Sequence, residues 1–371
     1  MTLISFAWVR ACSRLLEPLR RLVAYGWLRE SDVDAVLALL HPALRLNRVF
    51  ARLTQRQWVA DDMLELTLQA NGNWRGAQPG QHLQLYLERD GVRLSRSYSL
   101  TAVQTNGRVQ IAIKHQAGGQ VSPYLLEHLA VGDVLELGPV QGALSWPETP
   151  DAVLLLAAGS GITPLLGLLR SALAQGFSAP ITLLHYVREQ GQRAFAAELQ
   201  ALQAQYSNLQ VRWSLTAASA EAGALTGRFT AEHLHSVTAL PQCRVLACGP
   251  AGFVAQVQQW WQQAALPGAL QVEAFTPPAF NAVEGLRAVR LGFARSRQQM
   301  QADNQRSLLE LAEAQGLQPA HGCRQGICVS CTCTLLSGTV RDMRSGALFS
   351  EPGQPIRLCV SAPHADLEID L

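Results

Sequence analysis

The chain of 371 residues has little charge and almost no lysine. Lys114 is the only lysine among 30 basic residues, and charged residues make up 16% of the chain. We interpret the preference for arginine as a result of genome composition. The formal net charge is only +2, so the charge balance does not indicate a nucleic-acid partner. No apolar run approaches the roughly 20 residues that a membrane-spanning helix needs. The apolar start, residues 1–9, is short and lacks a basic lead, so we expect no signal peptide and a cytoplasmic protein.

The chain contains enough hydrophobic residues to form the cores of several domains. Hydrophobic residues make up 48% of it, which excludes a disordered chain. Many short alternating runs, separated by turn signals such as Asn71-Gly72, predict an antiparallel β-barrel. Apolar strands that then alternate with helical stretches predict a doubly wound α/β domain. The predicted domains are a helical N-terminal extension (1–45), a barrel (46–148), an α/β domain (149–276) and a C-terminal domain with a cysteine loop (285–371).

The N-terminal extension allows two interpretations. Leucines and valines recur near the helical period, and Ser31 begins an S-D-V-D sequence typical of a helix start. Six arginines lie in the same stretch. They could form a basic amphipathic surface in peripheral contact with a membrane or a membrane-bound partner. Alternatively, the extension is a helical cap packed on the next domain, with its arginines in solvent. We favour the cap.

Cysteines near the C-terminus carry the clearest chemical signal. Cys323, Cys328 and Cys331 have the spacing C-x4-C-x2-C, and Cys359 follows after a longer gap. They are too clustered for the disulfide framework of a short secreted chain. The spacing is that of the ligands of a plant-type 2Fe–2S cluster. A structural zinc site is the alternative, but such sites usually show paired C-x2-C knuckles. We therefore predict a 2Fe–2S cluster, with Cys333 as a buried thiol outside the ligand set.

A second motif lies in the predicted barrel. Arg96, Tyr98 and Ser99 form an R-x-Y-S sequence, which resembles the flavin motif of the ferredoxin-NADP reductase family. The resemblance implies that the arginine pairs with the flavin phosphate, the tyrosine packs on the isoalloxazine and the serine hydrogen-bonds the ring. FAD is favoured over FMN. In this family a glycine loop before a helix holds the FAD pyrophosphate, and here the loop would use Gly118, Gly119, Val121 and Ser122.

The α/β domain carries two short motifs in the order of the same family. An apolar strand leads into a turn of the form G-x-G-x-T/S-P, which is suited to a pyrophosphate. About ninety residues later a C-G-P motif follows another strand, and the resemblance places its cysteine near the nicotinamide. The residues of the two motifs are Gly159, Gly161, Thr163 and Pro164, and then Cys248, Gly249 and Pro250.

Residues after the strand 181–187 bear on the choice of coenzyme. Arg188 and Arg193 suit the additional phosphate of NADPH, whereas an acidic residue there would suit NADH. NADPH is the expected coenzyme, with NADH as the alternative. Near the end of the domain, Glu273 and Phe275 match an acid and an aromatic residue that the family often keeps near the flavin.

Residues 46–371 together resemble flavin reductases fused to a C-terminal 2Fe–2S ferredoxin, as found in oxygenase and desaturase electron-transfer chains. The cysteine loop also resembles plant-type ferredoxins at Arg324, Gly326 and Ser330. The resemblance implies a β-grasp fold for 285–371. It implies an enzyme that passes electrons from NADPH through FAD and the cluster, singly, to an external acceptor. The chemistry would be that of the cofactors, with no side chain as general acid or base.

The acceptor is the most open part of this prediction. Residues 1–45 are similar to the helical leader of reductases that serve membrane-bound fatty acyl desaturases. We therefore expect a membrane di-iron desaturase, which would bring the protein to the inner face of the membrane. The alternatives are a soluble or ring-hydroxylating oxygenase, a hybrid-cluster protein, or a redox sensor that is not an enzyme.

Overall fold

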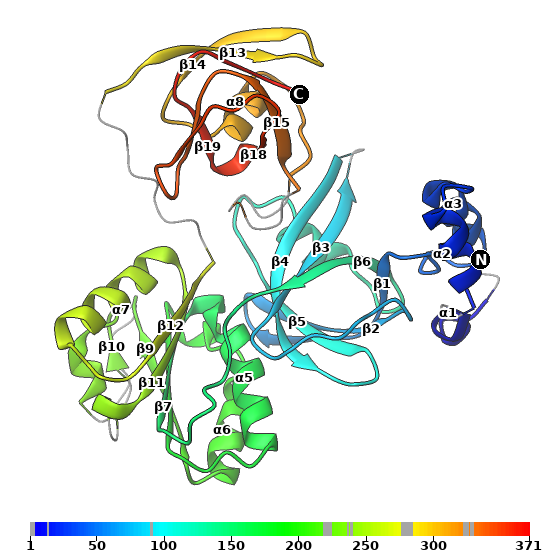
Figure 1. The fold of residues 1–371 in the computed structure, drawn as a ribbon. Coiled ribbons are helices and arrows are strands. Elements are labelled where there is room, and N and C mark those ends of the chain that lie inside the picture. The colour runs from blue at the N-terminus through cyan, green and yellow to red at the C-terminus, as the bar shows by residue number, and fades with distance from the viewer. Residues whose placement is uncertain are drawn as a thin grey trace. The chain divides into compact units, whose positions relative to one another are not determined.

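The computed structural model describes residues 4–12, 15–89, 92–217, 225–235, 237, 240–275, 285–321, 326 and 330–371. The chain divides into two compact units, which are described separately. The first contains the N-terminal helices, most of a barrel and a parallel-sheet domain, and the second contains residues 86–97 together with the C-terminal domain (Figure 1). Among the described residues, no helix is long and apolar enough to cross a membrane.

Three short helices form a cap on the barrel. They are α1 (Phe6–Cys12), α2 (Glu17–Ala24) and α3 (Glu30–Leu40). Their buried side chains, including Val9 and Leu37, pack with Phe50 and Val134 of the barrel. The expected cap is therefore present. Helix α3 begins one residue before the predicted start at Ser31.

Two arginines of the cap correct the expectation that they are simply in solvent. Arg20 donates to the main-chain oxygen of Leu46, with Nε–O and Nη2–O distances of 3.1 and 3.0 Å. Arg45 places its guanidinium over the ring of Phe50, 4.8 Å from its centroid. Both are part of the joint between the cap and the barrel.

Six antiparallel strands close into a barrel in the order β1-β2-β5-β4-β3-β6. Leucines and isoleucines alternate along the strands and fill the interior; Leu66 and Leu100, for example, both pair with Ile111 and are fully buried. Helix α4 (Ser122–His128) follows β5. The strands are β1 (Val49–Ala60), β2 (Met63–Ala70), β3 (His82–Arg89), β4 (Val92–Val103), β5 (Arg108–Lys114) and β6 (Val134–Gln141).

A six-stranded parallel sheet follows, in the order β10-β9-β8-β7-β11-β12. The chain runs outward from β7 on one side and returns to its other side with β11, so the strand order switches between β7 and β11. Ligands of open α/β sheets bind at such a switch, beyond the carboxyl ends of the strands. Its elements are β7 (Val153–Ala158), α5 (Ile162–Ala174), β8 (Ile181–Val187), α6 (Ala196–Gln205), β9 (Leu209–Leu215), β10 (Leu225–Thr226), β11 (Arg244–Gly249), α7 (Ala251–Ala264) and β12 (Leu270–Ala274).

The C-terminal unit combines a five-stranded sheet, in the order β14-β13-β20-β15-β18, with a three-stranded sheet, in the order β17-β16-β19. Helix α8 (Leu308–Ala314) packs its leucines into the same core as Phe293 and Leu335. A capping box between Ser307 and Glu310 fixes where this helix begins. The strands are β13 (Ala288–Phe293), β14 (Gln298–Asp303), β15 (Thr332–Ser337), β16 (Val340–Asp342), β17 (Leu348–Phe349), β18 (Pro355–Arg357), β19 (Ser361–Pro363) and β20 (Leu367–Ile369).

Candidate active site

The glycine turn lies at the switch point of the parallel sheet. Strand β7 ends at Ala158, the turn η1 spans Gly159–Gly161, and α5 begins at Ile162. Thr163 closes the turn by donating from Oγ1 to the oxygen of Ser160, at 2.9 Å. A Cβ on Gly161 would lie 1.9 Å from the main-chain oxygen of Cys248, so only glycine fits there. The turn and the C-G-P motif are thus in direct contact.

Backbone N–H groups at the start of α5 make this turn suited to a nucleotide pyrophosphate. Lys114, at the end of β5, adds a positive charge: its Nζ lies 3.6 Å from the position that a Cβ on Gly159 would take. Nζ is also 3.4 Å from Oδ2 of Asp62. The sequence alone assigns no role to this single lysine. Its position at the end of a predicted barrel strand was the available signal.

A buried histidine forms a hydrogen bond to the glycine turn. His185, on β8, is fully buried, and its Nε2 lies 2.9 Å from the oxygen of Gly159. Because a carbonyl oxygen only accepts, the ring nitrogen donates. Burial lowers the pKa of His185 to about 4, so the ring is neutral near pH 7. The histidine therefore fixes the turn without adding charge.

Cys248 and Glu273 are neighbours on the other side of the switch. They pair in register on β11 and β12, and Cys248 is completely buried. Burial, and next the charge of Glu273, raise the pKa of the Cys248 thiol well above its usual value, so the group stays a neutral thiol. Phe275 donates from its backbone nitrogen to the oxygen of Gly249 at 3.0 Å. The structure thus brings together residues that were predicted from two separate motifs.

A histidine of the barrel contacts Glu273, the neighbour of Cys248. Nδ1 of His82, on β3, lies 3.4 Å from Oε1 of Glu273. The preceding residue, Gln81, accepts at its main-chain oxygen from the nitrogen of Leu100, at 2.9 Å. His82 therefore lies between the strand that carries the R-x-Y-S motif and the acid next to Cys248. Nothing in the sequence pairs His82 with Glu273, which lies far away along the chain.

The two arginines predicted to select the coenzyme have different environments. Arg188 directly follows β8 and has an exposed side chain. Arg193 lies over the ring of Trp213, 5.7 Å from the centroid, and donates from Nε to the oxygen of Gln190 at 3.3 Å. Arg188 is therefore the better placed of the two to meet an additional phosphate.

The flavin motif lies on β4, next to the strand that leads into the glycine loop. Ser99 is buried, and Arg96 donates from Nη1 to the oxygen of Ser95 at 2.7 Å. In the loop, Gly118 adopts the left-handed conformation with φ of +72°. Ser122 accepts at Oγ from the nitrogen of Gln116, at 3.0 Å, and so holds the loop closed. Strands β4 and β5 are neighbours, so the motif and the loop belong to one part of the barrel.

The barrel and the parallel-sheet domain are joined by a partly buried arginine. Arg170, on α5, donates two hydrogen bonds of 2.6 Å to the carboxylate of Glu198. It also donates to the oxygen of Thr101 on β4 at 2.9 Å and lies 3.5 Å from Glu65 on β2. This arrangement holds the two cofactor-binding regions of the first unit together.

In the C-terminal unit two of the four predicted cluster ligands are described. The sulfur atoms of Cys331 and Cys359 are 3.2 Å apart, and both residues are buried. One metal ion can bridge thiolates at this separation, because metal–sulfur bonds are about 2.3 Å long. Cys323 and Cys328 lie outside the described residues, as does Arg324. Among the described residues, no group of three or more potential ligands is formed.

The position and conformation of Gly326 are suited to a residue that lies next to an iron–sulfur cluster. Its backbone nitrogen donates to the sulfur of Cys359 at 3.2 Å, the kind of bond that tunes an iron–sulfur centre. Its φ is +73°, and a Cβ would lie 2.7 Å from Val360 and 2.9 Å from Arg344. Arg357 donates to the oxygen of Gly326. Cys333 is also buried, as predicted, and burial raises the pKa of its thiol.

Comparison with known proteins agrees with this arrangement. The family model of the oxidoreductase FAD-binding domain matches residues 51–146 and that of the oxidoreductase NAD-binding domain matches residues 155–259. The model of the 2Fe-2S iron-sulfur cluster binding domain matches residues 293–364. The cofactors of the chain are therefore FAD, NAD(P)H and a 2Fe–2S cluster.

Several known proteins are similar to most of this chain. NADPH oxidoreductase of Mycobacterium tuberculosis is 33% identical over 300 residues, which cover 79% of this chain and 76% of that protein. The ferredoxin reductase component of 3-ketosteroid-9-alpha-monooxygenase of Rhodococcus rhodochrous is 28% identical, over 75% of this chain and 85% of that protein. The structure of phthalate dioxygenase reductase shares the fold, with a TM-score of 0.58 and 23% identity over 87% of this chain and 97% of that one. The chain belongs to the family of FAD- and NAD-binding oxidoreductases that carry a C-terminal 2Fe–2S domain.

Proposed function

We propose that the protein is the reductase component of a desaturase or oxygenase system and uses NADPH as its electron donor. The observation that carries this proposal is the contact between the glycine turn and the C-G-P motif. Two barrel residues lie next to this contact: Lys114 is close to Gly159, and His82 contacts Glu273. A nicotinamide held there would lie next to the flavin motif. When bound, the flavin supplies the conversion of two-electron transfer from the nicotinamide into single-electron transfer to the cluster.

The side chains would bind and orient rather than exchange protons. The start of α5 and Lys114 would hold the pyrophosphate, for which a helix N-terminus and a positive charge are suited. Cys248, neutral and buried, would form an apolar wall for the nicotinamide. Arg96, Tyr98 and Ser99 would bind the flavin.

NADPH is proposed over NADH because of Arg188. Its exposed guanidinium, directly after β8, can form forked hydrogen bonds to the additional phosphate. The relative from Mycobacterium tuberculosis carries the name NADPH oxidoreductase. The test is to measure kcat/KM for both coenzymes with ferricyanide as acceptor. A higher value for NADH than for NADPH would refute this choice.

For the cluster we propose Cys323, Cys328, Cys331 and Cys359 as ligands. The 3.2 Å separation of the sulfur atoms of Cys331 and Cys359 supports both as ligands of the cluster. The domain boundaries proposed above, 46–148, 149–276 and 285–371, contain the three matched models, with 1–45 as a separate extension.

For the acceptor we retain a membrane di-iron fatty acyl desaturase as the specific proposal, which would keep the protein at the cytoplasmic face of the membrane. Its support is the helical extension, residues 1–45. Two relatives are named as components of other systems, 3-ketosteroid-9-alpha-monooxygenase and heme-dependent oxidative N-demethylase, so an oxygenase component is the second candidate. Reconstitution with each class separates them: NADPH-dependent turnover of a desaturase supports the first. If only the oxygenase component is turned over, the oxygenase replaces the desaturase as the proposed acceptor.

A further inference from the structure

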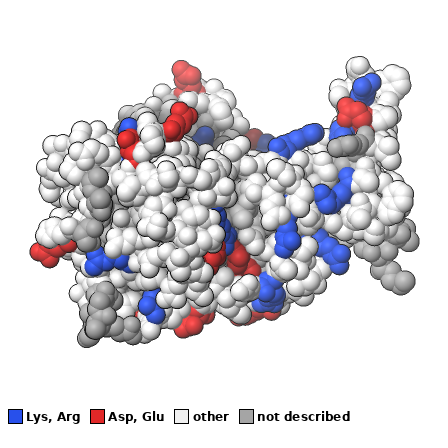
Figure 2. Space-filling view, turned by 90° about the horizontal axis from the view of Figure 1, so that it is seen from below, with Lys and Arg blue, Asp and Glu red and all other residues white. Residues whose placement is uncertain are grey.

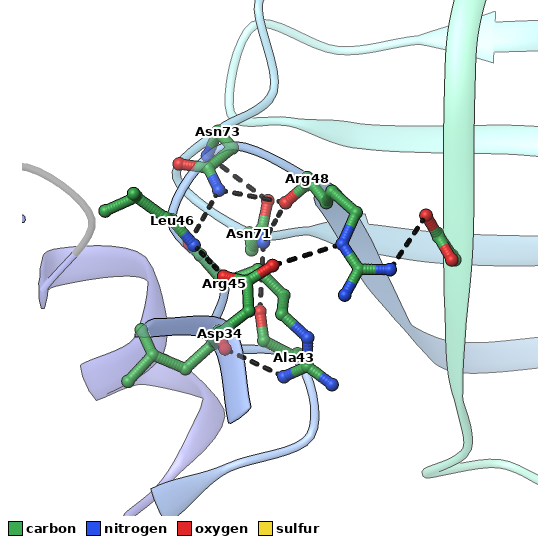
Figure 3. Close-up of polar contacts among 9 residues, drawn as sticks. Asp34, Ala43, Arg45, Leu46, Arg48, Asn71 and Asn73 are labelled. Atoms are coloured by element: carbon green, nitrogen blue, oxygen red, sulfur yellow. Dashed lines mark hydrogen bonds and ion pairs between the residues drawn. The ribbon is translucent and has the colours of Figure 1, made fainter. Parts of the chain in front are cut away.

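The cap of α1, α2 and α3 is fixed to the barrel by buried polar contacts (Figure 3). Oδ1 of Asp34 accepts from the backbone nitrogen of Leu46 at 2.7 Å, and Oδ2 lies 3.1 Å from Nε of Arg48. Asn71 and Asn73, in the turn after β2, donate to the main-chain oxygens of Ala43 and Arg45 at 3.0 and 2.9 Å. Because Asp34 and both asparagines are buried, these contacts hold the cap in one orientation. Its outer surface is therefore a fixed feature of the molecule.

That outer surface is unusually apolar. The described residues include 13 exposed large hydrophobic side chains, and eight of them lie between residues 8 and 40. Trp27 and Tyr25, in the turn between α2 and α3, are 78% and 76% exposed. Exposed apolar residues that occur singly need no explanation, but a concentration of them indicates an interaction site. We call these eight residues the outer apolar surface: Trp8, Leu15, Tyr25, Trp27, Leu28, Val36, Leu39 and Leu40.

Helix α3 shows that the exposure is organised by the fold. Val36, Leu39 and Leu40 have the spacing i, i+3, i+4, so they lie on one side of the helix. Asp34 and Leu37 of the same helix are buried against the barrel. The helix thus has an exposed apolar side besides the side that carries the buried Asp34 and Leu37, and among the described residues only the latter side is covered.

The residue types point to a lipid bilayer as the occupant of this surface. Tryptophan and tyrosine favour the membrane–water interface, and arginines next to them attract anionic head groups. Arg21 and Arg29 are exposed and flank the turn that carries Tyr25 and Trp27. Glu30 and Asp32, at the start of α3, reduce the positive charge, so apolar contact would supply most of the affinity. Figure 2 shows basic side chains, with few acidic ones among them, on the part of its face that the barrel and the cap form.

The position of the cap is compatible with catalysis at a membrane. The first residues of β1, such as Phe50, contact the cap. At the other end of this strand, Asp61 bonds from its nitrogen to the oxygen of Gly191 in the parallel-sheet domain. Eleven residue steps along the chain separate Phe50 from Asp61, which is at most about 36 Å at 3.3 Å per residue because β1 contains register shifts. A bilayer in contact with the cap would leave the nucleotide site accessible.

We propose that the outer apolar surface docks on the interfacial layer of an anionic lipid bilayer. No described helix can span a membrane, so the contact lies on the bilayer surface. The inference does not depend on which protein accepts the electrons. A protein that binds vesicles but reduces no oxygenase or desaturase would refute the proposed function alone, and the reverse result would refute this inference alone.

The test uses the full chain with its cofactors and unilamellar vesicles of phosphatidylcholine and phosphatidylglycerol in equal parts. We expect the protein to sediment with the vesicles and its tryptophan emission to shift to shorter wavelength. Trp27→Ser should weaken partitioning about tenfold, because it removes on the order of 1.4 kcal/mol of apolar transfer. Arg21→Gln should weaken it about fivefold on these vesicles and have little effect on pure phosphatidylcholine.

A matched control is Trp58→Ser, since Trp58 is 54% exposed on β1, outside the cap. It should leave partitioning unchanged, and both tryptophan variants should keep wild-type flavin content and ferricyanide reduction. Failure of the protein to sediment with either vesicle would overturn the proposal, as would equal losses for Trp27→Ser and Trp58→Ser. A lipid-independent dimer that Trp27→Ser dissolves would assign the surface to a second copy instead. A lipid-independent complex with the electron acceptor that Trp27→Ser abolishes would assign it to that protein.

Discussion

Replacing Gly161 by alanine tests the contact on which the nucleotide site depends. An added Cβ would lie 1.9 Å from the main-chain oxygen of Cys248, 2.4 Å from its carbonyl carbon and 2.8 Å from the nitrogen of Gly249. All three are backbone atoms of β11, so no side chain can rotate away. The φ of Gly161 is −60°, which alanine adopts without strain. The penalty is therefore steric, about 3 kcal/mol for a crowded core position.

If the turn opens to relieve this contact, the pyrophosphate site is distorted. We expect kcat/KM for NADPH to fall about 100-fold, the equivalent of about 2.7 kcal/mol. Flavin content should persist, because the flavin motif lies on the barrel. The assay is anaerobic stopped-flow reduction of the flavin by NADPH, together with the midpoint of thermal unfolding.

The matched control is Gly252→Ala, on α7, where an added Cβ would meet no atom within 4 Å. It should reduce the flavin at the wild-type rate and unfold at the wild-type temperature or slightly above. Gly161→Ala with an unchanged rate and an unchanged unfolding midpoint would refute the packing argument. Equal losses in the two variants would show that the effect is not specific to the contact with Cys248.

Three further predictions follow from single residues. Arg188→Ala should lower kcat/KM for NADPH at least tenfold and leave that for NADH nearly unchanged; equal effects on both would reverse the choice of coenzyme. Tyr98→Ala should weaken flavin retention, measured as flavin released on gel filtration, and full retention would remove Tyr98 from the flavin site. His185 is neutral in the folded protein because burial lowers its pKa from 6.5 to about 4. Stability is thus fully present above pH 6.5 and is lost as pH falls toward 4. Between pH 7 and 5 urea unfolding should show a loss of about 2 kcal/mol that His185→Gln does not share; identical losses in both proteins would refute it.

Local sequence patterns were sufficient for most of the fold. The apolar run at 153–157 predicts a strand and the stretch 164–174 predicts a helix, and the structure has β7 at Val153–Ala158 and α5 at Ile162–Ala174. The strand is easy to recognise because burial on both sides gives a continuous apolar run. Strand β10 is two residues long and β12 has no fully buried residue, so neither has a pattern to recognise.

Parts of the site required the tertiary structure. The proximity of Cys331 and Cys359 followed from a ligand pattern, but the 3.4 Å contact of His82 with Glu273 joins residues with no such pattern. The sequence shows that Lys114 is the only lysine, but not that it lies next to Gly159. The cap was predicted as helical, yet which of its apolar residues are buried depends on the contacts of Asp34 with the barrel.

The central claim is that electrons pass from NADPH through the flavin to the 2Fe–2S cluster and leave from there. The most direct measurement is anaerobic titration with NADPH, followed by flavin absorbance and by electron paramagnetic resonance, in the wild type and in Cys359→Ser. We expect flavin bleaching in both proteins and the signal of a reduced 2Fe–2S centre in the wild type only. Reduction of cytochrome c should be lost in Cys359→Ser while ferricyanide reduction continues. A retained cluster signal in the variant, or no signal in the NADPH-reduced wild type, would contradict it.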